Sequence, residues 1–127
     1  MAENPFANLD EETQKQIQEL QILEQNFQHL SRQKQAFQME MNETNNSIEE
    51  VKKAEGDVFK LTGQVMIKKT KEKLQEELEH KKELLKKRLD NIEKQEKDFS
   101  EKVNSLRDEI MKKISQQDKQ EDKENKQ

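Results

Sequence analysis

The chain has 127 residues, of which only 28% are hydrophobic and 41% are charged, and this composition excludes a large globular core. Its net charge of −4, with acidic and basic residues interleaved, argues against nucleic acid as a partner. The absence of cysteine excludes disulfides and thiolate metal sites, and it is compatible with a cytoplasmic address. The dominant residues keep most of their side-chain freedom in a helix, so a coiled coil and a disordered chain remain as alternatives.

A first long helix is predicted from residue 9 to residue 55. Apolar residues recur there at alternating steps of three and four, which is the heptad pattern of a coiled coil. Asn8, followed three residues later by Glu11, predicts a capping box at its start. Gly56 predicts its end, because glycine readily takes the left-handed conformation that closes a helix. The core positions expected in this helix are Leu23, Phe27, Leu30, Phe37, Met41 and Ile48.

The pattern changes to that of two short strands across residues 57–69. β-forming residues lie on either side of Thr62 and Gly63, which predicts a β-hairpin with a tight turn. A fully helical segment is the alternative, and it would place two glycines inside a helix at roughly 1 kcal/mol each. Both faces of the ribbon are apolar and its edges are unpaired, so we expect several hairpins to pair into a shared barrel. The residues expected to carry this oligomerisation are Val58, Phe59, Leu61, Gly63, Val65, Met66 and Ile67.

A second helix is predicted from residue 70 to residue 114, again with a heptad seam. An antiparallel register that sets Phe27 opposite Phe99 also brings two polar interruptions, Thr44 and Lys82, into one layer. Any two heptad frames can be aligned, so the register alone does not establish a hairpin. The fold class expected is therefore mainly α, a long antiparallel two-helix coiled coil joined by a single β-hairpin. The core positions expected in the second helix are Leu78, Leu85, Leu89, Ile92, Phe99 and Val103.

The domain organisation predicted is one domain of residues 1–115 followed by a tail. The tail, residues 116–127, has no apolar residue and is expected to be disordered. No apolar run approaches the roughly 20 residues needed to cross a bilayer, and the N-terminus has no apolar signal region. We therefore expect a soluble protein with no membrane partner.

Motifs for catalysis and for cofactor binding are absent from the sequence. Its two glycines do not form a phosphate-binding loop. His29 and His80 lie at outward heptad positions, and a zinc site needs four convergent groups. Glu76 and Glu77 are interpreted as part of a solvated helix face, and the basic run at residues 81–88 as a solvated flank. We expect no enzymatic activity, no cofactor and no metal.

Apolar residues exceed the heptad seam near the far ends of the two helices. Helix ends fray, and intermittently exposed apolar groups can bind the unburied side chains of unfolded proteins. The alternative is that these residues merely extend the coiled coil to its ends. The residues expected to form client-binding tips are Phe6, Leu9, Ile17, Leu20, Leu106, Ile110, Met111 and Ile114.

The order of long helix, hairpin and long helix resembles the β-class subunit of archaeal prefoldin. The most specific similarity lies in the hairpin and its exit, residues 58–69 (VFKLTGQVMIKK) and residues 70–78 (TKEKLQEEL). Residues 33–35 (QKQ) and 42–44 (NET) are also similar, and the resemblance covers roughly residues 8–115. A single hairpin is a mark of the β class, since α-class subunits have two.

The resemblance implies a hexamer of two α-class and four β-class subunits, whose hairpins form a double β-barrel. It implies an ATP-independent chaperone (a holdase) that captures unfolded proteins between coiled-coil tips and delivers them to a group II chaperonin. An alternative function is a structural spacer or tether that binds one defined partner. A third, RNA binding, predicts steep salt dependence.

Overall fold

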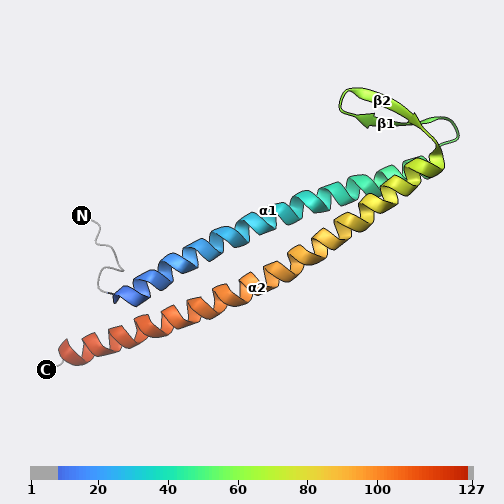
Figure 1. Cartoon of the computed structure of the whole chain (residues 1–127). Helices are drawn as coiled ribbons and strands as arrows, with labels where there is room; N and C mark the ends of the chain where they lie inside the picture. Colours follow the sequence, from blue (N-terminus) through green and yellow to red (C-terminus); the bar gives the residue numbers. More distant parts are fainter. Residues whose placement is uncertain (1–8, 126–127) are drawn as a thin grey trace. The chain divides into compact units, whose positions relative to one another are not determined.

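The computed structural model describes the backbone of residues 9–125 and the side chains of residues 9–116. Two helices, α1 (Glu11–Lys53) and α2 (Lys71–Asn125), flank two strands, β1 (Val58–Thr62) and β2 (Val65–Lys69), as Figure 1 shows. The chain falls into two units, one of residues Met1–Leu30 with Gln95–Gln127 and the other of Ser31–Lys94. Within each unit α1 and α2 run antiparallel. The predicted fold class, two long helices joined by one hairpin, is confirmed.

The start of α1 is capped by Asp10, two residues after the predicted Asn8. Oδ1 of Asp10 accepts a hydrogen bond from the backbone N–H of Thr13, at 2.8 Å. Hydrogen bonds from the side chain and backbone of Thr13 lower the pKa of Asp10. An aspartate carboxylate satisfies an orphan amide as well as an asparagine side chain does, and the predicted cap, Asn8, lies outside the described residues.

The end of α1 also differs from the prediction. The helix ends at Lys53, but Gly56 is not in the left-handed conformation. Instead, Nζ of Lys71 donates hydrogen bonds to the carbonyl oxygens of Lys52 (2.8 Å) and Ala54 (3.1 Å). The Lys71 ammonium group, at the start of α2, thus bonds the carbonyl oxygens at the end of α1. With a glycine cap, backbone N–H groups would have bonded such carbonyls instead.

The hairpin forms with an antiparallel register that begins with Val58 opposite Lys69. Gly63 and Gln64 make the two-residue turn. Gly63 has a φ of 62°, and no other described residue has a positive φ, which is the pattern of a type II′ turn with glycine first. This turn matches the twist of the flanking strands. The predicted hairpin is confirmed, and the fully helical alternative is wrong.

A small apolar cluster attaches the hairpin to both helices. Val58 of β1 packs with Val51 of α1 and Leu74 of α2, all three buried, and the half-buried Ala54 and Leu78 complete this anchor cluster. Burying each of the three central side chains contributes roughly 1.5–3 kcal/mol. The base of the hairpin is therefore fixed, while the rest of the ribbon extends beyond the cluster.

The two heptad seams face each other within each unit. A cation–π contact places the Arg88 guanidinium 5.7 Å from the centre of the Phe37 ring. Two helices cover each seam only from one side, so many seam residues remain half-exposed. Of the predicted core positions, Leu30, Ile48, Leu85, Ile92 and Val103 are buried, and Leu23, Phe27, Phe37, Met41, Leu78, Leu89 and Phe99 are half-buried.

One of the polar seam positions is buried and locally satisfied. Thr44 is 3% exposed, and its hydroxyl donates a hydrogen bond to the carbonyl oxygen of Glu40, 2.8 Å away. Lys82, the residue expected in the same layer, is exposed. A threonine that bonds back to the preceding turn can be buried without a partner on the facing helix.

The C-terminal end of α2 lies further along the chain than predicted. The helix continues to Asn125, whereas residues 116–127 were expected to be disordered. No glycine or proline follows Ile114, and the Gln, Lys and Glu residues there have good helix propensities. The end of the apolar pattern was therefore a poor predictor of the end of the helix.

Candidate functional site

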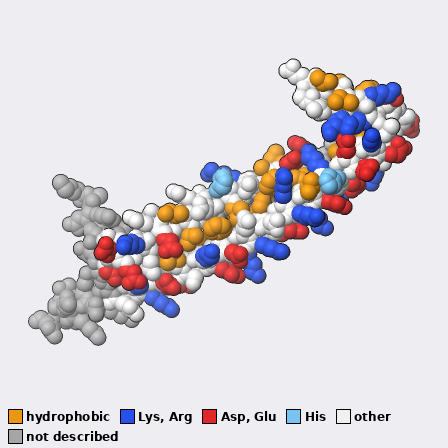
Figure 2. All heavy atoms as spheres, in the orientation of Figure 1, with side chains coloured by type: hydrophobic (Ala, Val, Ile, Leu, Met, Phe, Trp, Pro, Cys, Tyr) orange, Lys and Arg blue, Asp and Glu red, His pale blue; other side chains and the backbone are white. Residues whose placement is uncertain are grey.

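Exposed large hydrophobic side chains are concentrated on the hairpin. Leu61 is 69% exposed and Met66 is 66% exposed. Figure 2 shows apolar side chains at the surface of this end of the unit formed by Ser31–Lys94. Single exposed apolar residues are common, but a group on one small ribbon indicates an interaction surface. The exposed hydrophobic residues of the hairpin are Phe59, Leu61, Val65, Met66 and Ile67.

The hairpin has two different faces, because side chains alternate along a strand and residues opposite each other share a face. Phe59, Leu61 and Met66 lie on one of them, with Lys68 opposite Phe59. We call these three apolar residues the outer face. The other, inner face includes the buried Val58, so it is the one directed toward the helices. The outer face therefore has no packing partner within the described chain.

The inner face is bound to α2 by a carboxylate. Nζ of Lys60, from β1, lies 3.2 Å from Oε2 of Glu77, and Nζ of Lys69, from β2, bonds Oε1 of the same residue. The hydrogen bond from Lys69, followed by that from Lys60, holds the pKa of Glu77 below its ordinary value. Sequence reasoning missed this role, because the angle between hairpin and helix cannot be deduced from the sequence pattern.

Both long edges of the hairpin are unpaired within the part of the chain that the structure describes. The sheet has two strands, so each strand has a neighbour on one side only. Such an edge presents backbone N–H and C=O groups to which another strand can bind. The ion pair between Lys68 and Asp57 at 3.4 Å, near the base of the ribbon, joins two well-exposed side chains. The hairpin thus offers both apolar surface and free strand edges.

Two of the predicted oligomerisation residues, Val58 and Gly63, have roles within the chain. Val58 is buried in the anchor cluster and holds the hairpin to the helices. Gly63 makes the turn, where a Cβ would meet nothing within 4 Å but would require an unfavourable backbone conformation. The other five predicted residues, Phe59, Leu61, Val65, Met66 and Ile67, are the ones exposed at the surface of the hairpin.

The predicted client-binding tips lie where the first turns of α1 run beside the later part of α2, except Phe6, which lies outside the described residues. Met111 is 63% exposed, whereas Ile110 is 5% exposed and belongs to the seam. The structure therefore presents these residues as a partly open seam rather than as one continuous apolar patch. The half-buried members of the set are Leu9, Ile17, Leu20, Leu106 and Ile114.

Polar contacts join the two helices beside these residues. Nζ of Lys113 bonds the side-chain oxygen of Gln16 at 2.9 Å and lies 3.3 Å from Oε1 of Glu12. The Gln16 amide in turn donates to Glu109 at 3.3 Å. These side chains are partly or fully exposed to water, so each contact contributes little on its own. The helix ends are held together without a deep apolar core.

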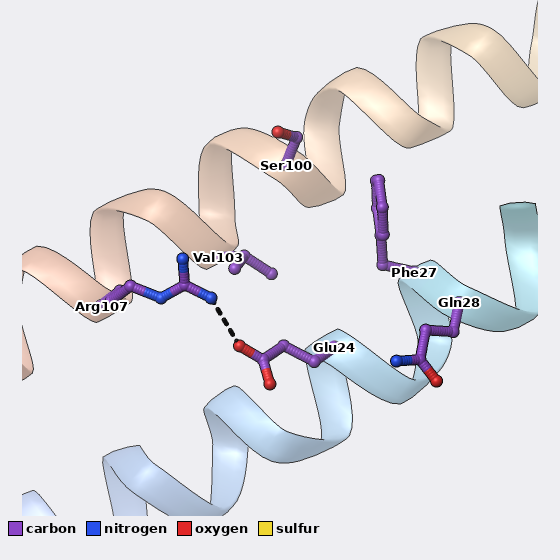
Figure 3. A pocket seen from close by; sticks show the side chains of 6 residues that line it. All are labelled: Glu24, Phe27, Gln28, Ser100, Val103 and Arg107. Atoms are coloured by element: carbon purple, nitrogen blue, oxygen red, sulfur yellow. Dashed lines mark hydrogen bonds and ion pairs between the residues drawn. The ribbon is translucent and has the colours of Figure 1, made fainter.

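Open grooves flank the seam in the same unit, and the sequence analysis did not anticipate them. One has a volume of about 220 Å³, and Figure 3 shows the Phe27 ring and Val103 beside it, with Arg107 and Glu24 joined at 2.7 Å across its rim. A second, of about 370 Å³, lies against Leu23 and Leu106. Each groove has one short side chain in its lining, Ser100 in the first and Ser105 in the second. The remaining residues that line the two grooves are Gln28, Glu19, Lys102 and Glu109.

The described residues do not assemble a metal or membrane site. Nowhere among them do three His, Cys, Asp or Glu side chains lie together as a metal site requires. His29 and His80 are both exposed. In this part of the chain, neither helix has a stretch apolar enough to span a bilayer.

Comparison with known proteins gives consistent similarities. The family model described as "Prefoldin subunit" matches residues 14–117. The prefoldin subunit beta of Pyrococcus furiosus is 33% identical over 105 residues, which cover 81% of this chain and 90% of that protein. The corresponding protein of Pyrococcus abyssi is 34% identical with the same coverage. The crystal structure of the prefoldin beta subunit from Thermococcus strain KS-1 is 32% identical, covers 83% of this chain and 94% of that one, and has a TM-score of 0.76.

Proposed function

This chain belongs to the β-class prefoldin subunit family, and we propose that it works as one subunit of a hetero-oligomeric chaperone that holds unfolded proteins without ATP. Prefoldins are a chaperone family not known to be enzymatic. The observation that carries the proposal is the hairpin, whose apolar side chains are exposed in the single chain. An exposed apolar group on so small a ribbon marks a surface that another subunit covers.

Assembly proceeds through the hairpin. Covering the outer face removes Phe59, Leu61 and Met66 from water, and strand pairing satisfies the free edges of β1 and β2. The composition we propose is that of the family resemblance, two α-class and four β-class subunits whose hairpins form a shared double β-barrel. This arrangement is supported by the hairpin itself, because the exposed outer face and the two unpaired strand edges belong to the same ribbon.

Client binding takes place at the other end of the helices. Unfolded proteins carry apolar side chains that the partly open seam and the exposed Met111 can contact, and methionine adapts its shape to varied partners. Each contact is weak, so affinity depends on several subunits binding one client at once. The grooves beside Phe27 and Val103 offer further space for client side chains. The residues we propose for this contact are the expected set without the buried Ile110, namely Phe6, Leu9, Ile17, Leu20, Leu106, Met111 and Ile114.

The held client is then passed to a group II chaperonin in the cytoplasm. This part of the proposal derives from the family resemblance. The chain needs neither ATP nor a metal ion for holding, because holding rests on apolar contact alone.

Suppression of client aggregation tests the proposed function. A complex carrying serine at Leu9, Leu20, Leu106 and Met111 should assemble with unchanged mass but lose suppression of a chemically unfolded model enzyme. The matched control replaces two exposed apolar residues outside this set, Ile22 and Met39, with serine. Circular dichroism of the complex checks that the helices persist.

Unimpaired suppression by the first variant would contradict the assignment of these residues. A parent complex that ignores every unfolded client and binds a single defined protein would favour the alternative, a coiled-coil tether.

A further inference from the structure

We propose that Glu77 is a positioning residue that fixes the direction of the hairpin on α2 and thereby determines which face is presented to neighbouring subunits. We call Glu77, Lys60 and Lys69 the Glu77 clamp. The inference rests on the proposed assembly through the hairpin. The inference makes no claim about the seam or the client-binding region.

The geometry of the clamp uses both carboxylate oxygens. Oε2 receives Lys60 from β1 at 3.2 Å, and Oε1 receives Lys69 from β2. Because each oxygen serves a different strand, sliding or rotating the ribbon on α2 breaks at least one of the two contacts. The side chains of Lys69 and Glu77 are 22% and 36% exposed, so both are partly sheltered from water. One residue of α2 thus binds the whole ribbon rather than one strand.

The anchor cluster cannot provide this orientation by itself. It holds the hairpin through Val58, the first residue of β1, and a ribbon held at one end can pivot. Lys60 lies two residues further along the strand, on the order of 7 Å away at the usual rise per residue. A second attachment at that distance converts a point of contact into a defined direction.

Neighbouring charged groups do not replace Glu77. Lys81, one helical turn further along α2, pairs with Glu40 of α1 at 3.4 Å. Lys68 pairs with Asp57 at 3.4 Å, within the hairpin region and not with α2. Lys71 bonds the carbonyl oxygens at the end of α1. Each of these contacts joins other parts of the chain, so the described ion pairs between hairpin and α2 all involve Glu77.

The clamp leaves the outer face uncovered. Lys60 and Lys69 lie on the inner face, as the register and the alternation of side chains require. With the base of that face held against α2, Phe59, Leu61 and Met66 are directed away from the helix, while Val65 and Ile67 of the inner face stay exposed nearer the turn. Without the clamp the ribbon samples other directions, and fixing one direction on association then costs conformational entropy, which weakens binding.

Spin-label distances measure the orientation directly, and the absence of native cysteine makes labelling specific. Labels at Gln64→Cys in the turn and Asp90→Cys on α2 report the distance between two exposed positions of the same unit. We expect Glu77→Gln to broaden or shift the distance distribution of the full-length chain. The control Glu76→Gln, an exposed neighbour with the same chemical change, should leave it unchanged. The triple variant Glu77→Lys, Lys60→Glu, Lys69→Glu should restore a narrow distribution.

A second readout separates the clamp from the assembly. In the complex with an α-class prefoldin subunit, Glu77→Gln should raise the dissociation constant about two- to tenfold, as expected for the loss of two partly exposed ion pairs. If Glu77→Gln leaves the distance distribution unchanged, Glu77 does not fix the direction of the hairpin. If the distribution broadens but the dissociation constant does not change, the clamp does not determine which face the hairpin presents to neighbouring subunits. A parent chain that never associates with prefoldin subunits overturns the proposed function instead.

Discussion

Replacing the paired residues Leu61 and Met66 with serine should separate the stability of the chain from the stability of the complex. These residues lie opposite each other on the outer face and are 69% and 66% exposed in the single chain. Their removal takes little packing from the chain itself, so its free energy of unfolding should change by no more than about 0.5 kcal/mol. The complex, by contrast, should lose the burial of both side chains.

The size of that loss follows from the exposed fraction. Full burial of such a side chain is worth about 1.5–3 kcal/mol, and about two thirds of each remains to be buried on association. The two replacements therefore cost about 2–4 kcal/mol, which raises the dissociation constant roughly 30- to 700-fold. Analytical ultracentrifugation across a dilution series measures this constant, with Met39→Ser, an equally exposed methionine on α1, as the control.

The result that refutes this reasoning is specific. If the double variant dissociates at the same concentration as the parent, the outer face is not an association surface. If it instead unfolds much more easily as a single chain, the two side chains pack within the chain in a way the structure does not contain.

Three further predictions concern the hairpin. Leu74→Ala should lower the free energy of unfolding by about 2–5 kcal/mol in a urea titration, because it opens a cavity in the anchor cluster; a change below 0.5 kcal/mol would contradict the packing described. Gly63→Ala should destabilise the hairpin by about 1–2 kcal/mol, since alanine tolerates the positive φ poorly, and hydrogen exchange of the β1 amides should quicken accordingly. Acidification should release the clamp, because Lys69 and Lys60 lower the pKa of Glu77 in the folded chain. The stabilisation of the hairpin by the carboxylate is therefore complete above the ordinary pKa of 4.5 and is lost as the pH falls through the lowered pKa. The labelled chain should therefore show a narrow distance distribution at pH 7 and a broad one at pH 3. If the distribution of the Glu77→Gln variant does not change between these pH values, the broadening is due to Glu77.

The elements were predictable from the sequence because each has a local signal. The heptad spacing gave the two helices, and the β-forming residues around Gly63 gave the strands. The turn required a residue that tolerates positive φ, and Gly63 was the glycine placed to supply it. Local chemistry is sufficient where the interaction involves residues close in sequence.

Features that depend on three-dimensional contact were not predictable in the same way. The carbonyls at the end of α1 are satisfied by Lys71, which lies well beyond the helix they belong to, and Gly56 has an ordinary conformation. Glu77 had the appearance of a solvated residue, because its two partners come from another element. In both cases a lysine acts across a change in chain direction whose angle the sequence pattern does not define.

The helix-end residues show the limit of a hydrophobic pattern as a guide to binding. Ile110 and Met111 are adjacent in sequence and were assigned the same role, yet one is buried in the seam and the other is exposed. Adjacent positions on a helix point about 100° apart, so the pattern identifies the region and not the residues that a client touches.

Hydrogen exchange of the hairpin amides, in the single chain and in its complex with an α-class prefoldin subunit, tests the central claim most directly. Strand pairing between subunits predicts that amides on the free edges of β1 and β2 become slow to exchange on association, while amides in the middle of α1 keep their rates. Edge amides that exchange as quickly in the complex as in the isolated chain would contradict assembly through the hairpin.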